Sequence, residues 1–315
     1  MLNYKNPLPI KGKNVPTAQP DPYIIEKDGI YYIFATHARG VSAYSSDNLT
    51  DWKYEGLVCS IEGHNQYWAP CVIEYCGKFY LYFSSREDSF QGIHGDSLKV
   101  AVSERPLGPY RYIKQICRPF SIDPHVVTNT NGELFLFYST NDEDSLTKAG
   151  TYIVADKLLD PFTPEDKPAS ILRPSLKEEI FEKDRFKKGQ DWHTLEGAFY
   201  FRIGSTHYLM YSANAYTSEN YFVGYAIAHG EENDLRKLRF TKYPDDHTYY
   251  PLLRRNEFVE GTGHNSLLRG PDGKLYIVYH GRDIGTKSDT VDTRRMRIDE
   301  LLVDGDKLTV LGPTY

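Results

Sequence analysis

The sequence predicts an all-β fold and, within that class, a five-bladed β-propeller. A pattern made of a head residue, an apolar run, a turn containing glycine and an aromatic-rich strand occurs five times along the chain. Successive heads lie about 50 to 70 residues apart, which is enough for a four-stranded sheet with its loops. A doubly wound α/β fold would need long amphipathic helices between its strands, and no such pattern is found.

Each of the five units contains two β-type runs around a glycine turn, which is typical of a β-hairpin. A third strand follows several units, as in "GVSAYSSDNLTDW" and "LKVAVSERPLGPY". We expect residues 1–315 to form a single propeller domain. The units are "DPYIIEKDGIYYIFAT" from Asp21, "APCVIEYCGKFYLYFSS" from Ala69, "DPHVVTNTNGELFLFYST" from Asp123, "EGAFYFRIGSTHYLMYSA" from Glu196 and "HNSLLRGPDGKLYIVYHG" from His264.

Two segments lie outside the repeats. "PSLKEEIFEKDRF", between the third and fourth units, predicts a surface helix, because Ser175 and Glu178 have the spacing of a capping box. Residues 1–10 are expected either to add a strand to the last blade or to pack across one face.

Composition narrows the classes of partner. The chain has 315 residues, 40% of them hydrophobic, so it can bury a substantial core. Its net charge of −6 provides no basic stripe for nucleic acid, and we expect no nucleic-acid partner. The 26 tyrosines suit carbohydrate, since each offers a flat face with a hydroxyl at its rim, although strand propensity explains most of them.

The cysteines and the termini bear on the cellular compartment. The four cysteines match no zinc or thioredoxin spacing and are expected to be free thiols in a reducing compartment. We find neither a signal peptide nor an apolar run long enough to span a membrane, and we expect no membrane partner. The expectation is a cytoplasmic protein, with a secreted form that has lost its signal as the alternative. The oligomeric state stays open.

Acidic heads indicate a functional site. The first strand of each propeller blade lines the central axis, so Asp21, Asp123, Glu196 and His264 should converge at one end of the channel. Asp-Pro often begins a turn, so any one acid could be a turn residue. Three acids at one repeat position are harder to explain this way, because crowded carboxyls repel one another and lose solvent. Two such acids suffice for glycoside hydrolysis, and a third can raise the pKa of the acid.

Several motifs occur in the order typical of one enzyme family. They are "PDPYII", "YWAPCVI", "SIDPHVV", "LEGAFYF", "GTGHNSLL", "LYIVYHGR" and "RRMRIDEL", and they span nearly the whole chain. Together they resemble the family-43 glycoside hydrolases, five-bladed propeller enzymes that act on arabinose- and xylose-containing glycans. The resemblance implies an inverting enzyme in which Asp21 is the general base, Glu196 the general acid and Asp123 the carboxylate that tunes and positions the acid. Base and acid should then stand roughly 6.5–9.5 Å apart.

The resemblance also implies binding residues. Trp68 matches an aromatic sugar platform, with core packing as the alternative, and Arg294 matches an arginine that reaches a sugar hydroxyl, with Arg295 as its rival. His264 matches a central histidine near which some members hold hydrated calcium. The alternative is a neutral, hydrogen-bonded imidazole, and no cofactor is expected for the chemistry. Where the family more often has an acid after "WAP", this chain has Cys71, which affects substrate contacts or packing. Two further residues are expected to line the pocket, Phe34 and His193.

For the substrate we expect an arabino- or xylo-oligosaccharide. An exo-acting α-L-arabinofuranosidase is favoured, because the chain ends at Tyr315 without the β-sandwich carried by many β-xylosidases of the family. The alternatives are a β-D-xylosidase or bifunctional enzyme, then an endo-arabinanase, then a sugar-binding propeller without chemistry. A retaining fructan hydrolase would need Asn-Asp-Pro-Asn and Arg-Asp-Pro, where this chain reads "QPDPY" and "SIDPH".

Overall fold

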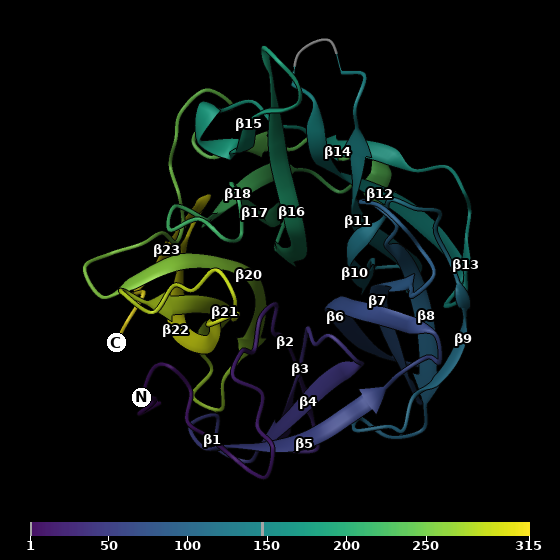
Figure 1. Cartoon of the computed structure of the whole chain (residues 1–315), viewed down its shortest axis with the longest axis vertical. Coiled ribbons are helices and arrows are strands. Elements are labelled where there is room, and N and C mark those ends of the chain that lie inside the picture. The colour runs from purple at the N-terminus through teal and green to yellow at the C-terminus, as the bar shows by residue number, and fades with distance from the viewer. Residues whose placement is uncertain (1, 146–147) are drawn as a thin grey trace.

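The computed structural model describes residues 2–145 and 148–315. Antiparallel sheets are arranged around a central axis, with β2, β6, β10, β16 and β20 innermost (Figure 1). The third and fourth blades form one continuous sheet, because β12 and β16 pair in parallel at Gly150–His193 and Thr151–Thr194. Five blades result, and the predicted fold class is confirmed.

The first two blades are regular four-stranded meanders. In both, the strands run in chain order from the axis outward. The first contains β2 (Tyr23–Lys27), β3 (Ile30–Ala35), β4 (Val41–Ser46) and β5 (Trp52–Cys59). The second contains β6 (His64–Tyr75), β7 (Lys78–Glu87), β8 (Ser97–Ser103) and β9 (Arg111–Gln115).

The remaining blades follow the same plan. The third contains β10 (Ile122–Thr128), β11 (Leu134–Asp142) and β12 (Gly150–Asp160), with the short β13 (Thr163–Pro164) and β14 (Ala169–Leu172) paired to β12. The fourth contains β16 (Gln190–Ile203), β17 (Thr206–Ala213), β18 (Phe222–His229), the 3-10 turn η2 (Leu235–Lys237) and β19 (Thr241–Lys242). The fifth contains β20 (Val259–Arg269), β21 (Leu275–Asp283), β22 (Arg295–Asp304) and β23 (Lys307–Val310).

The N-terminal segment fills the seam between the first and fifth blades. Strand β1 (Ile10–Lys11) pairs in parallel with β5, and the Leu8 N–H donates to the Met296 carbonyl at 2.9 Å. The side-chain amide of Asn6 exchanges two hydrogen bonds with the backbone of Ile298. The segment is therefore not a strand of the last blade but closes the ring beside it; Met1 lies outside the described residues.

Apolar packing between neighbouring blades supplies the core. The described residues form five apolar clusters, and each joins one pair of adjacent blades. Phe34 and Ala43 of the first blade, for example, pack with Leu81 and Phe83 of the second. Each sheet is thus covered on both faces, which explains why its strands are apolar on both sides rather than alternating.

The helix predicted from "PSLKEEIFEKDRF" is wrong. One 3-10 turn, η1 (Lys177–Glu179), leads directly into β15 (Ile180–Lys187), which pairs antiparallel with the start of β16. The carboxylate of Glu179 accepts the backbone N–H groups of Ser175 and Leu176 and pairs with buried Lys242. Strand pairing therefore satisfies the backbone that the capping-box pattern assigned to a helix. Among the described residues, no helix is long and apolar enough to cross a membrane.

Candidate active site

A bulge recurs at the start of the innermost strands. In β16, Glu196 lies opposite Ser212 and Phe199 opposite Met210, so one extra residue is inserted, and the same shift occurs in β6, β10 and β20. Such bulges re-aim side chains. The extra residue has a positive φ, and every blade has one: Asp21 (56°), Ala69 (44°), Asp123 (56°), Gly197 (62°) and His264 (49°).

The fourth head is therefore one residue later than the sequence pattern predicts. Gly197 occupies the left-handed position, so Glu196 is equivalent to Trp68 of the second blade rather than to Asp123. A Cβ at position 197 would lie 3.2 Å from the His264 ring, so glycine also leaves room for that imidazole.

The predicted heads converge on one cavity of about 830 Å³. Its size suits a few sugar units, and all five blades contribute to its lining. The lining includes Asp21, Thr36, His37, Gln66, Trp68, Asp123, Glu196, Tyr216, Tyr221, His264, Arg282 and Arg294.

Asp21 is buried, and a hydroxyl, a guanidinium and two imidazoles surround its carboxyl group. The Thr36 hydroxyl donates to Oδ2 at 2.6 Å, and Arg294 Nη1 lies 3.4 Å from Oδ1. The Nδ1 atoms of His264 and His280 lie 3.5 and 3.3 Å from the same oxygen. Burial opposes ionisation, but these imidazoles and the guanidinium outweigh it and lower the pKa of Asp21 well below its ordinary value. Burial lowers the pKa of both histidines, while the charge of Asp21 opposes this effect.

Glu196 has the opposite electrostatic environment. Burial raises the pKa of Glu196 to about 7, and the charge of Asp21 adds to this, while Tyr221 and Arg294 oppose it. The Tyr221 hydroxyl donates to Oε1 at 2.7 Å, and the Tyr221 ring stacks on His280 with centroids 5.7 Å apart. One cavity thus contains a carboxyl whose pKa is lowered and another whose pKa is raised.

Asp123 is the third buried carboxyl. The Gly197 N–H donates to its Oδ2 at 3.0 Å. Burial, followed by the charges of Glu196 and Asp21, raises the pKa of Asp123 well above its ordinary value. The three carboxyls therefore do not ionise together, and the negative charge lies on Asp21, beside Arg294.

The two predicted sugar-binding residues both line the cavity. Trp68 is half-buried, with the Arg86 guanidinium 5.3 Å from its ring centroid. Arg294 forms charge-assisted hydrogen bonds with Asp292 as well as approaching Asp21. Its rival Arg295 lies outside the cavity lining and donates to Gln19 instead.

Two predicted pocket residues lie elsewhere. Phe34 is fully buried between the first two blades and packs edge-on against Tyr110, because the alternation of β3 turns its side chain into that interface. His193 lies before the bulge of β16, where the strand pairs with β12 and β15. Neither residue belongs to the cavity lining.

Sequence reasoning missed a polar position that ends the second strand of each blade. In three blades this residue accepts the backbone N–H of the next head. Thr36 accepts from Ala69 at 2.7 Å, Ser212 from His264 at 2.7 Å, and His280 Nδ1 from Asp21 at 3.1 Å. The recurring endings "FAT", "FSS", "YST", "YSA" and "YHG" carry this signal. Tyr221, also missed, immediately precedes the third strand of its blade, β18, without a recurring pattern.

A hydrated calcium ion near His264 stays a prediction. Within residues 2–145 and 148–315, no group of three or more His, Cys, Asp or Glu side chains is arranged to coordinate an ion. An ion held by one imidazole and water would not need such a group, so this finding does not test the prediction. The imidazole Nδ1 lies 3.5 Å from Oδ1 of Asp21, and we assign no step to a metal.

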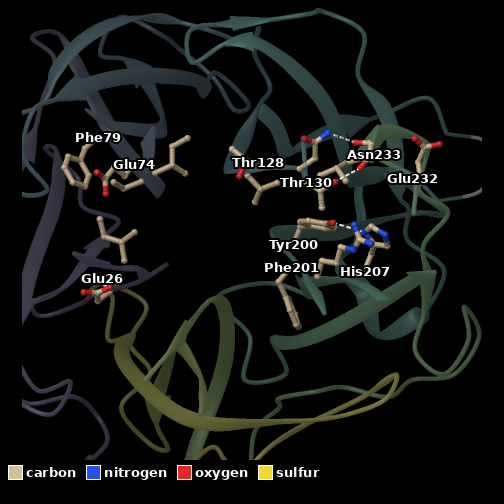
Figure 2. Close-up of a pocket in the computed structure, with 17 residues that line it drawn as sticks. Glu26, Glu74, Phe79, Thr128, Thr130, Tyr200, Phe201, His207, Glu232 and Asn233 are labelled. Atoms are coloured by element: carbon tan, nitrogen blue, oxygen red, sulfur yellow. Dashed lines mark hydrogen bonds between the residues drawn. The ribbon is translucent and has the colours of Figure 1, made fainter. Parts of the chain in front are cut away.

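A second cavity, of about 590 Å³, lies at the other end of the channel (Figure 2). It is lined by the far ends of innermost strands, including Glu26, Glu74 and Thr128. Figure 2 shows a hydrogen bond between the Tyr200 hydroxyl and His207. The hydroxyl oxygen lies 2.7 Å from His207 Nδ1. Between the cavities, the second residues after the heads form a layer, in which Tyr23, His125 and Phe199 are in ring contact. Cys71 and Ser266 complete this layer and are fully buried.

Two carboxyls with pKa values moved in opposite directions, facing one sugar-sized cavity, are the arrangement that glycoside hydrolysis requires. The family model "Glycosyl hydrolases family 43" matches residues 11–307, and the chain belongs to this family. The family resemblance and the enzyme class predicted from the motifs are therefore confirmed.

Individual relatives agree with this assignment. Xylosidase/arabinosidase 43A of Humicola insolens is 27% identical over 253 residues, which cover 62% of this chain and 75% of that protein. A probable arabinan endo-1,5-alpha-L-arabinosidase C of Aspergillus clavatus is 35% identical over 108 residues, 32% of each chain. The crystal structure of a thermostable family-43 glycoside hydrolase superposes with a TM-score of 0.80 at 28% identity, covering 99% of this chain and 97% of that one. An alpha-L-arabinofuranosidase from Lactobacillus brevis, at 22% identity and a TM-score of 0.75, covers 94% and 95% and supports the fold alone.

Proposed function

We propose that this protein is an inverting, exo-acting glycoside hydrolase that releases α-L-arabinofuranosyl residues from arabinose-containing oligosaccharides. One observation carries the proposal: a single cavity contains Asp21, whose pKa is lowered by its donors, and Glu196, whose pKa burial raises to about 7. Near neutral pH these are a general base and a general acid.

In the proposed reaction, Asp21 takes a proton from water as the water oxygen bonds to the anomeric carbon. Glu196 protonates the glycosidic oxygen as its bond to that carbon breaks. Since Oε1 of Glu196 accepts from Tyr221, the transferred proton comes from Oε2. Direct attack by water on the face opposite the leaving group inverts the anomeric configuration.

Asp123 acts in this scheme as a positioning group. Its Oδ2 accepts the N–H of Gly197, the residue after the acid. Because the charge of Glu196 raises the pKa of Asp123, Asp123 keeps its proton after Glu196 donates and does not repel the new carboxylate.

The names of the relatives support five-carbon sugars as substrates, since the Humicola protein is described as a xylosidase/arabinosidase and the Aspergillus protein as an arabinan endo-arabinosidase. A β-D-xylosidase or a bifunctional enzyme is the second candidate. Trp68 offers a stacking face and Arg294 a donor fork to either sugar.

The shape of the cavity supports exo action. Two segments line the catalytic cavity beside the first and fifth blades and form a wall there. They are residues 16–18, before the first blade, and residues 287–294, in the fifth blade. The layer containing Tyr23 and His125 lies further along the axis, beyond the cavity lining. An endo-acting enzyme would need a groove that crosses the face, through the position of this wall.

Initial rates on an aryl α-L-arabinofuranoside and an aryl β-D-xyloside, at matched concentration near neutral pH, test the proposal. A preference for the arabinofuranoside is expected, and the first product anomer, followed by NMR, should be inverted. A preference for the xyloside would favour the second candidate. Retention of configuration, or no turnover on either glycoside and none on arabinan oligomers, would contradict the mechanism.

A further inference from the structure

A second group of aromatic side chains lies at the same end of the propeller as the carboxyls. The loop after β7 and the β15–β16 hairpin both project from this end, because β7 runs toward it and β16 starts there, before its bulge. We call the group formed by Phe90, His94, Phe120, Phe186 and Trp192 the rim cluster. It joins the second, third and fourth blades.

Ring contacts define the geometry of the rim cluster. The His94 ring lies 4.8 Å from Phe120 and stacks on Trp192 at 5.6 Å. Phe186 meets Trp192 edge-on at 5.1 Å, and the Arg185 guanidinium lies 5.0 Å from the Phe186 centroid. A buried tryptophan thus supports rings contributed by three blades.

The outer rings of the cluster are exposed. Phe186 is 53% exposed, Phe90 41% and the neighbouring Ile93 56%, whereas Trp192 is 2% exposed. The Phe90 ring packs over Gly95, where a Cβ would lie 2.3 Å from the ring, so this phenylalanine has a defined position. Apolar surface fixed in this way and open to solvent is typical of a binding surface.

The rim cluster lies outside the cavity lining, but neighbours in the chain and side-chain contacts link the two. Phe120 precedes Ile122 and Asp123, and both of these line the cavity. On the other side, Arg86 lies over the ring of Trp68 and pairs with Asp96, next to the loop that carries His94.

The direction of the reaction identifies the occupant. Glu196, on the fourth blade, protonates the leaving oxygen, while Asp21, on the first blade, activates water from the opposite face of the sugar. The leaving group therefore extends away from the first blade, toward the side where the rim cluster lies. The wall formed by residues 16–18 and 287–294 is on the other side.

We propose that the rim cluster binds the sugar units on the leaving-group side of the scissile bond, and so selects oligosaccharides over short glycosides. This rests on the proposed function, because the side is defined by the roles of Asp21 and Glu196. Apolar sugar faces stack on exposed rings such as Phe186, and neutral chains of pentose units fit a surface of this chemistry.

Binding in an inactive background tests the proposal without turnover. In Glu196→Gln, titration calorimetry with a ladder of linear oligosaccharides, from disaccharide to pentasaccharide of the sugar that the parent prefers, should give affinity that rises with length. Adding Phe186→Ala should weaken binding of the longer members about fivefold and leave the disaccharide nearly unchanged. Phe90→Ala is a second variant, on a separate loop, with the same expectation.

Phe258→Ala is the matched control. Phe258 is 49% exposed, lies just before β20 on the fifth blade and is absent from both the cavity lining and the rim cluster. Its removal should not change the length dependence. Equal affinities of the Phe186→Ala and background proteins along the whole ladder, or equal losses for all lengths, would overturn the inference. A parent that binds the ladder with this length dependence yet hydrolyses none of it would instead contradict the proposed function.

Discussion

The two cavities at the ends of the channel differ in chemistry more than in size. The catalytic cavity measures about 830 Å³ and the distal one about 590 Å³, and innermost strands line both. In the distal cavity, polar side chains already pair with one another. Tyr200 forms a hydrogen bond with His207, Thr130 forms one with Asn233, and Glu74 forms a salt bridge with Lys27. In the catalytic cavity, buried carboxyls face one another, and their pKa values are moved in opposite directions.

This difference shows what distinguishes a reactive cavity from a packing gap. Polar groups that already satisfy one another gain little by binding a ligand, since they would exchange one hydrogen bond for another. Carboxyls crowded at Asp21 and Glu196 reduce stability, and the reaction uses the resulting separation of pKa values. Variants with equivalent changes in the two cavities should therefore behave differently.

The largest difference is expected for the acidic residues. Asp21→Asn should lower kcat at least about a thousandfold on every substrate, because water activation is needed whatever the leaving group. Glu74→Gln, a similar change in the distal cavity, should leave kcat within about twofold, since Glu74 does not reach the reaction. Steady-state rates on aryl glycosides and oligosaccharides measure both. Substantial activity in Asp21→Asn would remove the base assignment.

A smaller and selective effect is expected at the acid. Glu196→Gln should reduce rates about a hundredfold or more on oligosaccharides, but much less on aryl glycosides with acidic phenols, because good leaving groups need little protonation. The dependence of log kcat on the pKa of the leaving phenol should steepen in the variant. Identical losses across the phenol series would indicate a structural role for Glu196 or a different acid.

The smallest effect is expected for two phenol hydroxyls. The hydrogen bond from Tyr221 favours ionised Glu196, so Tyr221→Phe should raise the pKa of Glu196 and move the alkaline limb of the pH–rate profile above its starting value near pH 7. The rate on oligosaccharides should fall about tenfold. The pKa of Asp21 is well below its ordinary value. The pH–rate profiles of the parent enzyme and of Tyr221→Phe should therefore show no acid limb at mildly acidic pH.

Tyr200→Phe is the counterpart in the distal cavity. It removes the bond to His207 and should cost about 1 kcal/mol of unfolding free energy, with no change in the pH–rate profile. Thermal unfolding and pH profiles of both variants separate the two cases. An alkaline limb unmoved in Tyr221→Phe would show that Tyr221 does not tune the acid.

The sequence predicts the five-bladed architecture and the convergence of the acids on one cavity, but neither the register of the fourth blade nor the contacts between blades. Period and turn chemistry predict the five hairpins, and the recurrence of Asp-Pro predicts that Asp21 and Asp123 share a position. The sequence pattern assigned Glu196 to the head position of the fourth blade, but this position belongs to Gly197. Only the backbone shows this, because Gly197 has the positive φ that the other four heads share.

Other misses have the same origin in tertiary structure. Tyr221 reaches Glu196 from the third strand of the blade, and His280 reaches Asp21 across the seam where the ring closes. Phe34 appeared suitable for a pocket by residue type, yet strand alternation turns it into the core. The helix prediction was wrong because the segment "EKDRF" belongs to β15, which pairs with β16.

The layer beneath the carboxyls has a kinetic consequence. Tyr23, His125 and Phe199 are in ring contact across the axis. If they leave no passage for a sugar, substrate and both products use a single entrance. In the proposed mechanism the shortened oligosaccharide lies nearer that entrance and departs first, and the monosaccharide departs last. Free monosaccharide should then compete with substrate for the empty enzyme. Each turnover ends in complete dissociation, so successive cleavages of one chain are independent encounters, and a polymer is shortened in a distributive rather than a processive manner.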